Sequence, residues 1–176
     1  MHASITTKIA AVVSTAAIFF CAPALAQGGD PRPIGVTSVG PWEIVVWGTG
    51  KRVQRCTLIR ARDAGDASYG FLVDQRGLIM SIESQDWTLA AGKPAPTTIT
   101  LPKGKPRTVR AEPVSPTRAN IDLAANDPLL SDLQTAESAS VKIGVKIVKL
   151  PFDDFNAARV TLEICVQSIG KDWRGN

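Results

Sequence analysis

The stretch YGFLVDQRGLIMSIE, residues 69–83, decides the fold. Two apolar runs, at 69–73 and 78–82, flank a polar tetrapeptide that ends in Gly77. A glycine at that position can adopt the positive φ that a tight turn with a bulge requires. Alternate residues of the second run fall on one face, as in a half-buried strand. The pattern predicts a β-hairpin.

Further strand-like segments lie on both sides of this hairpin. The segment at 42–47 is rich in β-branched and aromatic residues, which favour strands. The segment at 141–148 alternates most regularly, and its odd-numbered residues, including Val145 and Ile147, are expected to face the core. Together the expected strands are 42–47, 53–62, 69–73, 78–82, 97–101, 107–111, 118–123 and 141–148.

Two segments late in the chain have helical patterns. Asp127 followed by Pro128 is typical of a helix start and predicts a short helix to about residue 137. Apolar residues at spacings of three and four predict a C-terminal helix within 152–169, with a strand at 160–166 as the alternative. The expected fold is mainly β: an antiparallel β-sandwich or partly open barrel with a short helix and a C-terminal helix.

Residues 1–26 have the layout of a secretory signal peptide. Lys8 gives a charged start, an apolar run follows at 9–20, and an A-x-A cleavage site ends at Ala26. The apolar run is shorter than the roughly 20 residues that a membrane-spanning helix needs. We therefore expect cleavage after Ala26 and a periplasmic mature protein without a transmembrane anchor. Secretion and association with the outer membrane are the alternatives.

The rest of the chain has the pattern of one domain. Residues 27–39 are rich in Gly and Pro and lack a hydrophobic period, which predicts a flexible N-terminal segment. Residues 40–176 are predicted to form a single β-rich domain. A mature chain of about 150 residues is long enough for one hydrophobic core.

The composition argues against most hydrolase designs. The only histidine, His2, leaves with the predicted signal peptide, so the mature chain has no imidazole base and no His metal ligand. Ser–Lys and carboxylate chemistry remain as routes to a His-independent hydrolase. Loss of Lys8 lowers the formal charge from +4 to +3, an excess too mild to indicate a nucleic-acid partner. We expect no cofactor and no bound metal.

Two cysteines, Cys56 and Cys165, remain in the mature chain. In an oxidising compartment an even pair is most simply a disulfide, with free thiols or an intermolecular bridge as alternatives. A bridge between them closes a loop of about 110 residues, which the chain-entropy relation values at about 4 to 5 kcal/mol.

Two groups of acidic residues could do acid–base work. Asp74, Glu83 and Asp86 could converge near the hairpin, although turns collect acidic residues in any case. Asp153 and Asp154 are adjacent near the start of the last helix, where their charge suits the helix dipole and their side chains diverge. We assign no catalytic residue.

The basic residues are the candidates for a contact surface. Lys103, Lys105 and Arg107 fall in a Pro-rich turn, where they could grip phosphates, an acidic glycan or an acidic protein. The alternative is a solvated loop whose lysines block edge pairing of strands. Lys51, Arg52 and Arg55 form a second, smaller basic group, for which the case is weaker.

Short motifs in a fixed order cover most of the mature chain. They are the signal peptide, GPWEIV at 40–45, CTLI at 56–59, the hairpin at 69–82, Trp87 with Leu89, DPLLSDL at 127–133 before the 141–148 segment, and the helix at 155–165. In this order they resemble the invasion-associated locus B family, exported proteins of alphaproteobacteria. The resemblance implies a role in host-cell contact and brings no catalytic residues. That family often has a cysteine shortly after the opening Trp, where this chain has Val46 and Trp47, and this departure leaves the pairing of Cys56 open.

These observations together predict an exported, non-enzymatic binding protein of the invasion-associated locus B type. Its expected partner is an envelope or host protein or glycan, and its expected role is envelope function or host-cell association. An inhibitor of a lysozyme-like or other envelope or host enzyme is the first alternative. A His-independent hydrolase is the second.

Overall fold

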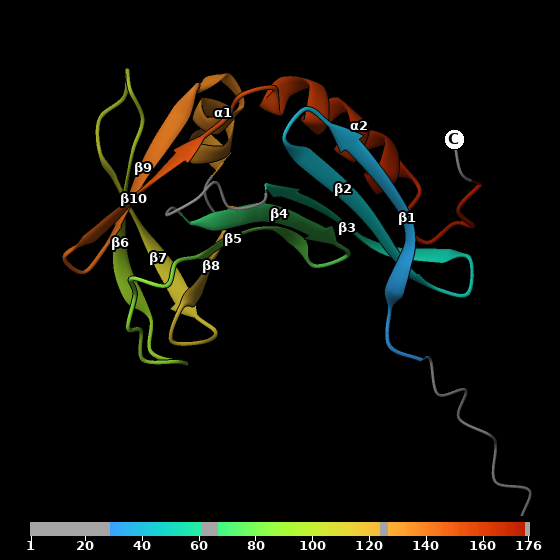
Figure 1. Cartoon of the computed structure of the whole chain (residues 1–176), viewed down its shortest axis with the longest axis horizontal. Coiled ribbons are helices and arrows are strands. Elements are labelled where there is room, and N and C mark those ends of the chain that lie inside the picture. Colours follow the sequence, from blue (N-terminus) through green and yellow to red (C-terminus); the bar gives the residue numbers. More distant parts are fainter. Residues whose placement is uncertain (1–28, 61–66, 124–126, 175–176) are drawn as a thin grey trace, which may run out of the picture.

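The computed structural model describes residues 29–60, 67–123 and 127–174. In these ranges ten antiparallel strands form one sheet, and two helices lie over one side of it (Figure 1). The prediction of a mainly β fold with a short helix and a C-terminal helix is confirmed, and the sheet is not closed into a barrel. The predicted signal peptide, residues 1–26, lies outside the described residues. The strands are β1 Arg32–Val39, β2 Trp42–Thr49, β3 Arg52–Arg60, β4 Ser68–Asp74, β5 Gly77–Glu83, β6 Ala95–Thr100, β7 Arg107–Pro113, β8 Arg118–Asp122, β9 Ser138–Ile143 and β10 Lys146–Pro151; the helices are α1 Asp127–Thr135 and α2 Phe155–Gln167.

The sheet has the strand order β1-β2-β3-β4-β5-β8-β7-β6-β9-β10. Its first five strands form a simple meander, and the next three run through the sheet in reverse order of sequence. The sheet bends sharply between these parts, so that β6, β7, β9 and β10 stand beside the meander rather than continuing its plane (Figure 1). Helix α2 lies across β1, β2 and β3, and α1 lies beside β9 and β10.

One face of the bent sheet holds the core. The predicted hairpin forms as β4 and β5, and Met80 and Ile82 of its second strand are fully buried. An aromatic cluster fills the space between the meander and the start of α2, with Trp42 and Tyr69 packed edge to face at a centroid distance of 5.5 Å. Aromatic pairs of this geometry add about 0.5–1.5 kcal/mol beyond the area they bury. The other members of the cluster are Phe71, Phe152 and Phe155.

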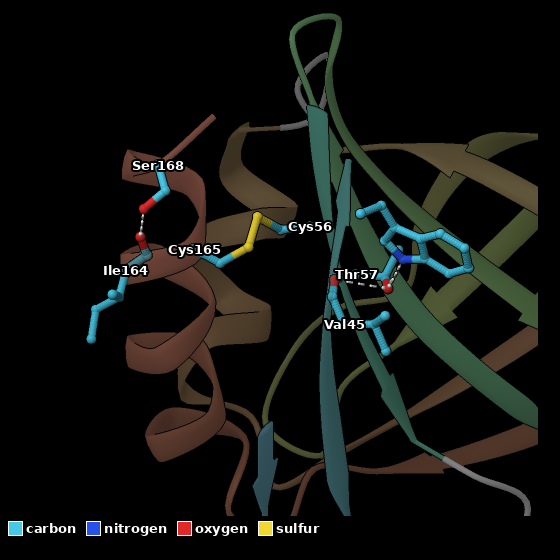
Figure 2. Close-up of a disulfide and its surroundings, with 7 residues drawn as sticks. Val45, Cys56, Thr57, Ile164, Cys165 and Ser168 are labelled. Atoms are coloured by element: carbon cyan, nitrogen blue, oxygen red, sulfur yellow. Dashed lines mark hydrogen bonds between the residues drawn. A yellow bond between two sulfur atoms is a disulfide. The ribbon is translucent and has the colours of Figure 1, made fainter. Parts of the chain in front are cut away.

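The predicted disulfide is confirmed. Cys56 of β3 and Cys165 of α2 are bonded, with their Cα atoms 6.1 Å apart. Cys56 points toward α2, and its neighbour Thr57 points to the opposite face of the sheet (Figure 2). Cys165 lies on the buried stripe of α2, so the C-terminal segment is a helix and not the alternative strand at 160–166.

The prediction that 141–148 forms one strand is wrong. The chain reverses at Gly144 and Val145, and β9 and β10 form a hairpin on either side of them. Gly144 has a φ of 60°, the left-handed conformation that such a tight turn requires. The two-residue turn moves the buried face of β10 to Val148 and Leu150, which leaves Val145 89% and Ile147 60% exposed.

The flexible segment predicted at 27–39 is also wrong over most of its length. Residues 32–39 form β1, paired with β2 from Arg32 opposite Gly48 to Val39 opposite Trp42. A register shift lies between Pro33 and Gly35. Because β1 is the last strand of the sheet at this side, its proline removes no hydrogen bond that an interior strand would need. The same edge position explains the missing hydrophobic period, since much of the strand is exposed.

Candidate functional site

A pocket of about 530 Å³ lies where the β6–β7 loop meets the end of α1. The loop, residues 101–106, projects beyond the sheet (Figure 1). Buried Leu101 forms part of the pocket wall, and Lys103 and Lys105 are exposed beside it. The remaining lining residues are Pro102, Gly104, Arg107, Asp132, Thr135, Ala136 and Glu137.

The conformation of this loop follows from its sequence. Pro102 and Pro106 restrict the backbone at both ends, and the N–H of Gly104 donates to the carbonyl of Leu101 at 3.2 Å. Lys103 and Lys105 are both exposed in this loop. Neither lysine has an ion-pair partner among the described residues. Their charges therefore stay available to a ligand.

Arg107 differs from the two lysines because it is already paired. Its Nη2 donates to Oδ2 of Asp132, which joins the start of β7 to α1. Both side chains are partly exposed, so solvent screens the pair and limits it to about 0.2–1 kcal/mol. The structure thus brings the three predicted contact residues to one pocket, with two free cations and one neutralised cation. Their role in binding stays a prediction.

The acidic residues near the hairpin do not converge. Asp74 pairs across the β4–β5 turn with Gly77, whereas Glu83 lies at the other end of β5, opposite Ser68. Hydrogen bonds from Arg76 hold the pKa of Asp74 below its ordinary value, and Glu83 accepts from Arg118 Nη2 at 2.7 Å. These carboxylates act as ion-pair partners in the structure.

Asp153 has a structural partner that the sequence did not reveal. Its Oδ2 lies 3.0 Å from Nη2 of Arg60, an arginine that is only 6% exposed. The backbone carbonyl of Asp153 also accepts the indole N–H of Trp42 at 2.7 Å. Asp154 precedes α2 with a φ of 56° and makes no side-chain capping bond. The adjacent aspartates therefore fix the entry into α2 and do not form a pair.

No family model, curated protein or solved structure matches the chain. Within the described ranges, no three His, Cys, Asp or Glu side chains are grouped so that they could hold a metal ion. Neither α1 nor α2, the helices of that part of the chain, has the length and apolar character to cross a membrane.

Proposed function

We propose that this chain is an exported, non-enzymatic binding protein whose contact surface is the pocket between the β6–β7 loop and α1. The observation that carries the proposal is the placement of Lys103 and Lys105 at the rim of a pocket of about 530 Å³, where neither has a carboxylate partner in the part of the chain that the structure describes. The partner is an acidic segment of an envelope or host protein or glycan. Its role is envelope function or host-cell association.

The pocket combines charge with an apolar wall. Leu101 is buried in the core, and Ala136, which directly follows α1, also lines the pocket. A partner with an acidic group and a short apolar portion would satisfy both parts of this surface. The prolines of the loop and the Arg107–Asp132 pair hold the surface before binding, which lowers the entropy lost on association.

Three further observations support export and a binding role. Residues 1–26 have the signal-peptide pattern, and the Cys56–Cys165 disulfide suits an oxidising compartment. The motif order resembles the invasion-associated locus B family, whose name implies host contact. A second candidate function, inhibition of a lysozyme-like or other envelope or host enzyme, is favoured by the projecting β6–β7 loop, which could enter a cleft (Figure 1).

The test places a photo-crosslinking residue at position 104 of the full chain in its native cells. An added Cβ at Gly104 meets only the Cβ of Leu101, at an ordinary 3.5 Å, so the loop can accept it. We expect an adduct with an envelope or host component at 104. The adduct should weaken with rising salt, because screening shortens the reach of exposed charges to about 10 Å at 0.1 M.

Charge-reversal variants, with a matched control pair, test whether Lys103 and Lys105 make the contact with the partner. Lys103→Glu with Lys105→Glu should abolish the adduct at 104, whereas Lys146→Glu with Lys149→Glu, at exposed positions of β10, should leave it intact. Equal adduct yields in both variants would contradict the proposal. Loss of activity of a lysozyme added to the purified protein, reversed by the same loop variant, would instead support the inhibitor.

A further inference from the structure

A second hollow, of about 450 Å³, lies in the meander. It is distinct from the loop–helix pocket, the one between the β6–β7 loop and α1. Residues of β3 near the β2–β3 turn and residues of the β4–β5 turn line the second hollow together. Three arginines line the hollow: Arg52 and Arg55 from β3, and Arg76 from the β4–β5 turn. The other lining residues are Pro31, Val53, Gln54, Asp74, Gln75 and Gly170.

The single carboxylate among these lining residues is already occupied. Asp74 accepts Nε and Nη2 of Arg76 at 3.0 and 2.6 Å, and its Oδ1 accepts the backbone N–H of Arg76 at 2.8 Å. Arg52 and Arg55 have no ion-pair partner among the described residues. Three guanidinium groups and one carboxylate therefore line the hollow, so the charged groups of its lining are positive in sum.

Arg55 is held in place without an anion. Its guanidinium carbon lies 4.6 Å from the centroid of the Trp47 ring, and the Trp47 indole N–H donates to Oγ1 of Thr57 at 2.9 Å. The Nε of Arg55 is buried and has no hydrogen-bond partner in the described structure. A buried donor left without a partner is costly, and a bound ion or water is one of the groups that satisfies such a donor. The Trp47 ring holds the Arg55 side chain in place, and the Arg55 guanidinium group carries the positive charge that would attract an anion.

We propose that this hollow binds a phosphate group, either free phosphate or the phosphomonoester of a lipid headgroup. Guanidinium groups present flat pairs of donors that match phosphate oxygens, and they bind phosphate more specifically than ammonium groups do. Arg52 and Arg55 contact the phosphate directly. Arg76, already bound to Asp74, adds long-range attraction from the other turn. The site is separate from the loop–helix pocket and does not depend on the function proposed for it.

The experiment titrates the purified mature protein with inorganic phosphate and, in a second arm, with phosphatidylcholine vesicles that contain or lack phosphatidic acid. Binding is followed by calorimetry and by tryptophan fluorescence, because the Trp47 ring lies against Arg55. Arg55→Gln and Arg52→Gln should each weaken binding about tenfold, as expected for loss of one charge-assisted bond. Arg110→Gln removes an exposed strand arginine elsewhere in the sheet and should leave the affinity unchanged.

The outcomes separate the two sources of phosphate. Saturable binding of inorganic phosphate supports a free-phosphate site, and binding only to the phosphatidic acid vesicles supports a lipid headgroup. Trp47→Phe should remove the fluorescence response while calorimetric binding persists. Circular dichroism checks that Arg55→Gln folds, and the exposed Arg52→Gln gives the same test if it does not. Failure of both probes to bind, or equal weakening by Arg110→Gln, would overturn the proposal.

Discussion

Removal of the Cys56–Cys165 bridge should lower stability more than any surface substitution while leaving the fold intact. The bridge spans 109 positions of sequence, and the chain-entropy relation gives about 4.8 kcal/mol for a loop of this size. Measured losses for small exported domains are about 2–5 kcal/mol, so the calculated value lies at the upper end. Helix α2 should still pack in the double variant, because Phe155, Ala158 and Leu162 bury its inner face without the sulfur atoms.

Urea unfolding of Cys56→Ala with Cys165→Ala measures this loss. With a slope of about 2 kcal/mol per molar urea, the midpoint should fall by about 1–2.5 M. The wild-type protein under reducing conditions is the matched comparison and should unfold at nearly the same midpoint as the variant. The far-ultraviolet spectrum before unfolding should be unchanged. A midpoint that falls by less than about 0.5 M would refute the loop-closure reasoning.

Three smaller perturbations test other parts of the structure. Leu162→Ala, on the buried face of α2, should cost about 2–4 kcal/mol in chemical unfolding, whereas Val160→Ala, on the exposed face of the same helix, should cost under about 0.5 kcal/mol. Gly144→Ala should cost about 1 kcal/mol through backbone strain alone, since an added Cβ has open space there, and a thermal midpoint equal to wild type would contradict this. The lowered pKa of Asp74 means that its contribution to stability is complete above the ordinary value of 3.8 and is lost as the pH falls through the folded value. Acid titrations of wild type and Asp74→Asn should therefore converge at the lowest pH, and curves that stay parallel would count against the ion pair.

The parts of the fold that the sequence predicted well depend on local pattern. The 69–83 hairpin has two apolar runs around a turn glycine, and both strands formed as expected. The segment 141–148 failed because alternation continues through a two-residue turn, so that the reversal at Gly144 leaves no break in the pattern. Strand β1 escaped detection because an edge strand tolerates proline and buries few of its side chains.

The candidate sites were predictable only in part, because each is assembled from distant segments. The sequence singled out Lys103 and Lys105 by charge and proline content, but their pocket exists because the loop meets Asp132 and the end of α1. The pairing of buried Arg60 with Asp153 spans 93 positions and has no local signature. Arg55 belonged to a small basic group in the sequence. Its position over Trp47 depends on the β2–β3 register, which places the two residues opposite each other.

The covalent link between β3 and α2 also changes what a protease can do to this protein. Any single backbone cut between Cys56 and Cys165 leaves the two fragments tethered, and this interval contains seven of the ten strands of the described sheet. A nicked molecule can then reassemble within itself at a rate that does not depend on dilution. A single proteolytic cut in this interval would thus not separate the protein into two free fragments, and the loops between Cys56 and Cys165 can vary or be cleaved without loss of either fragment.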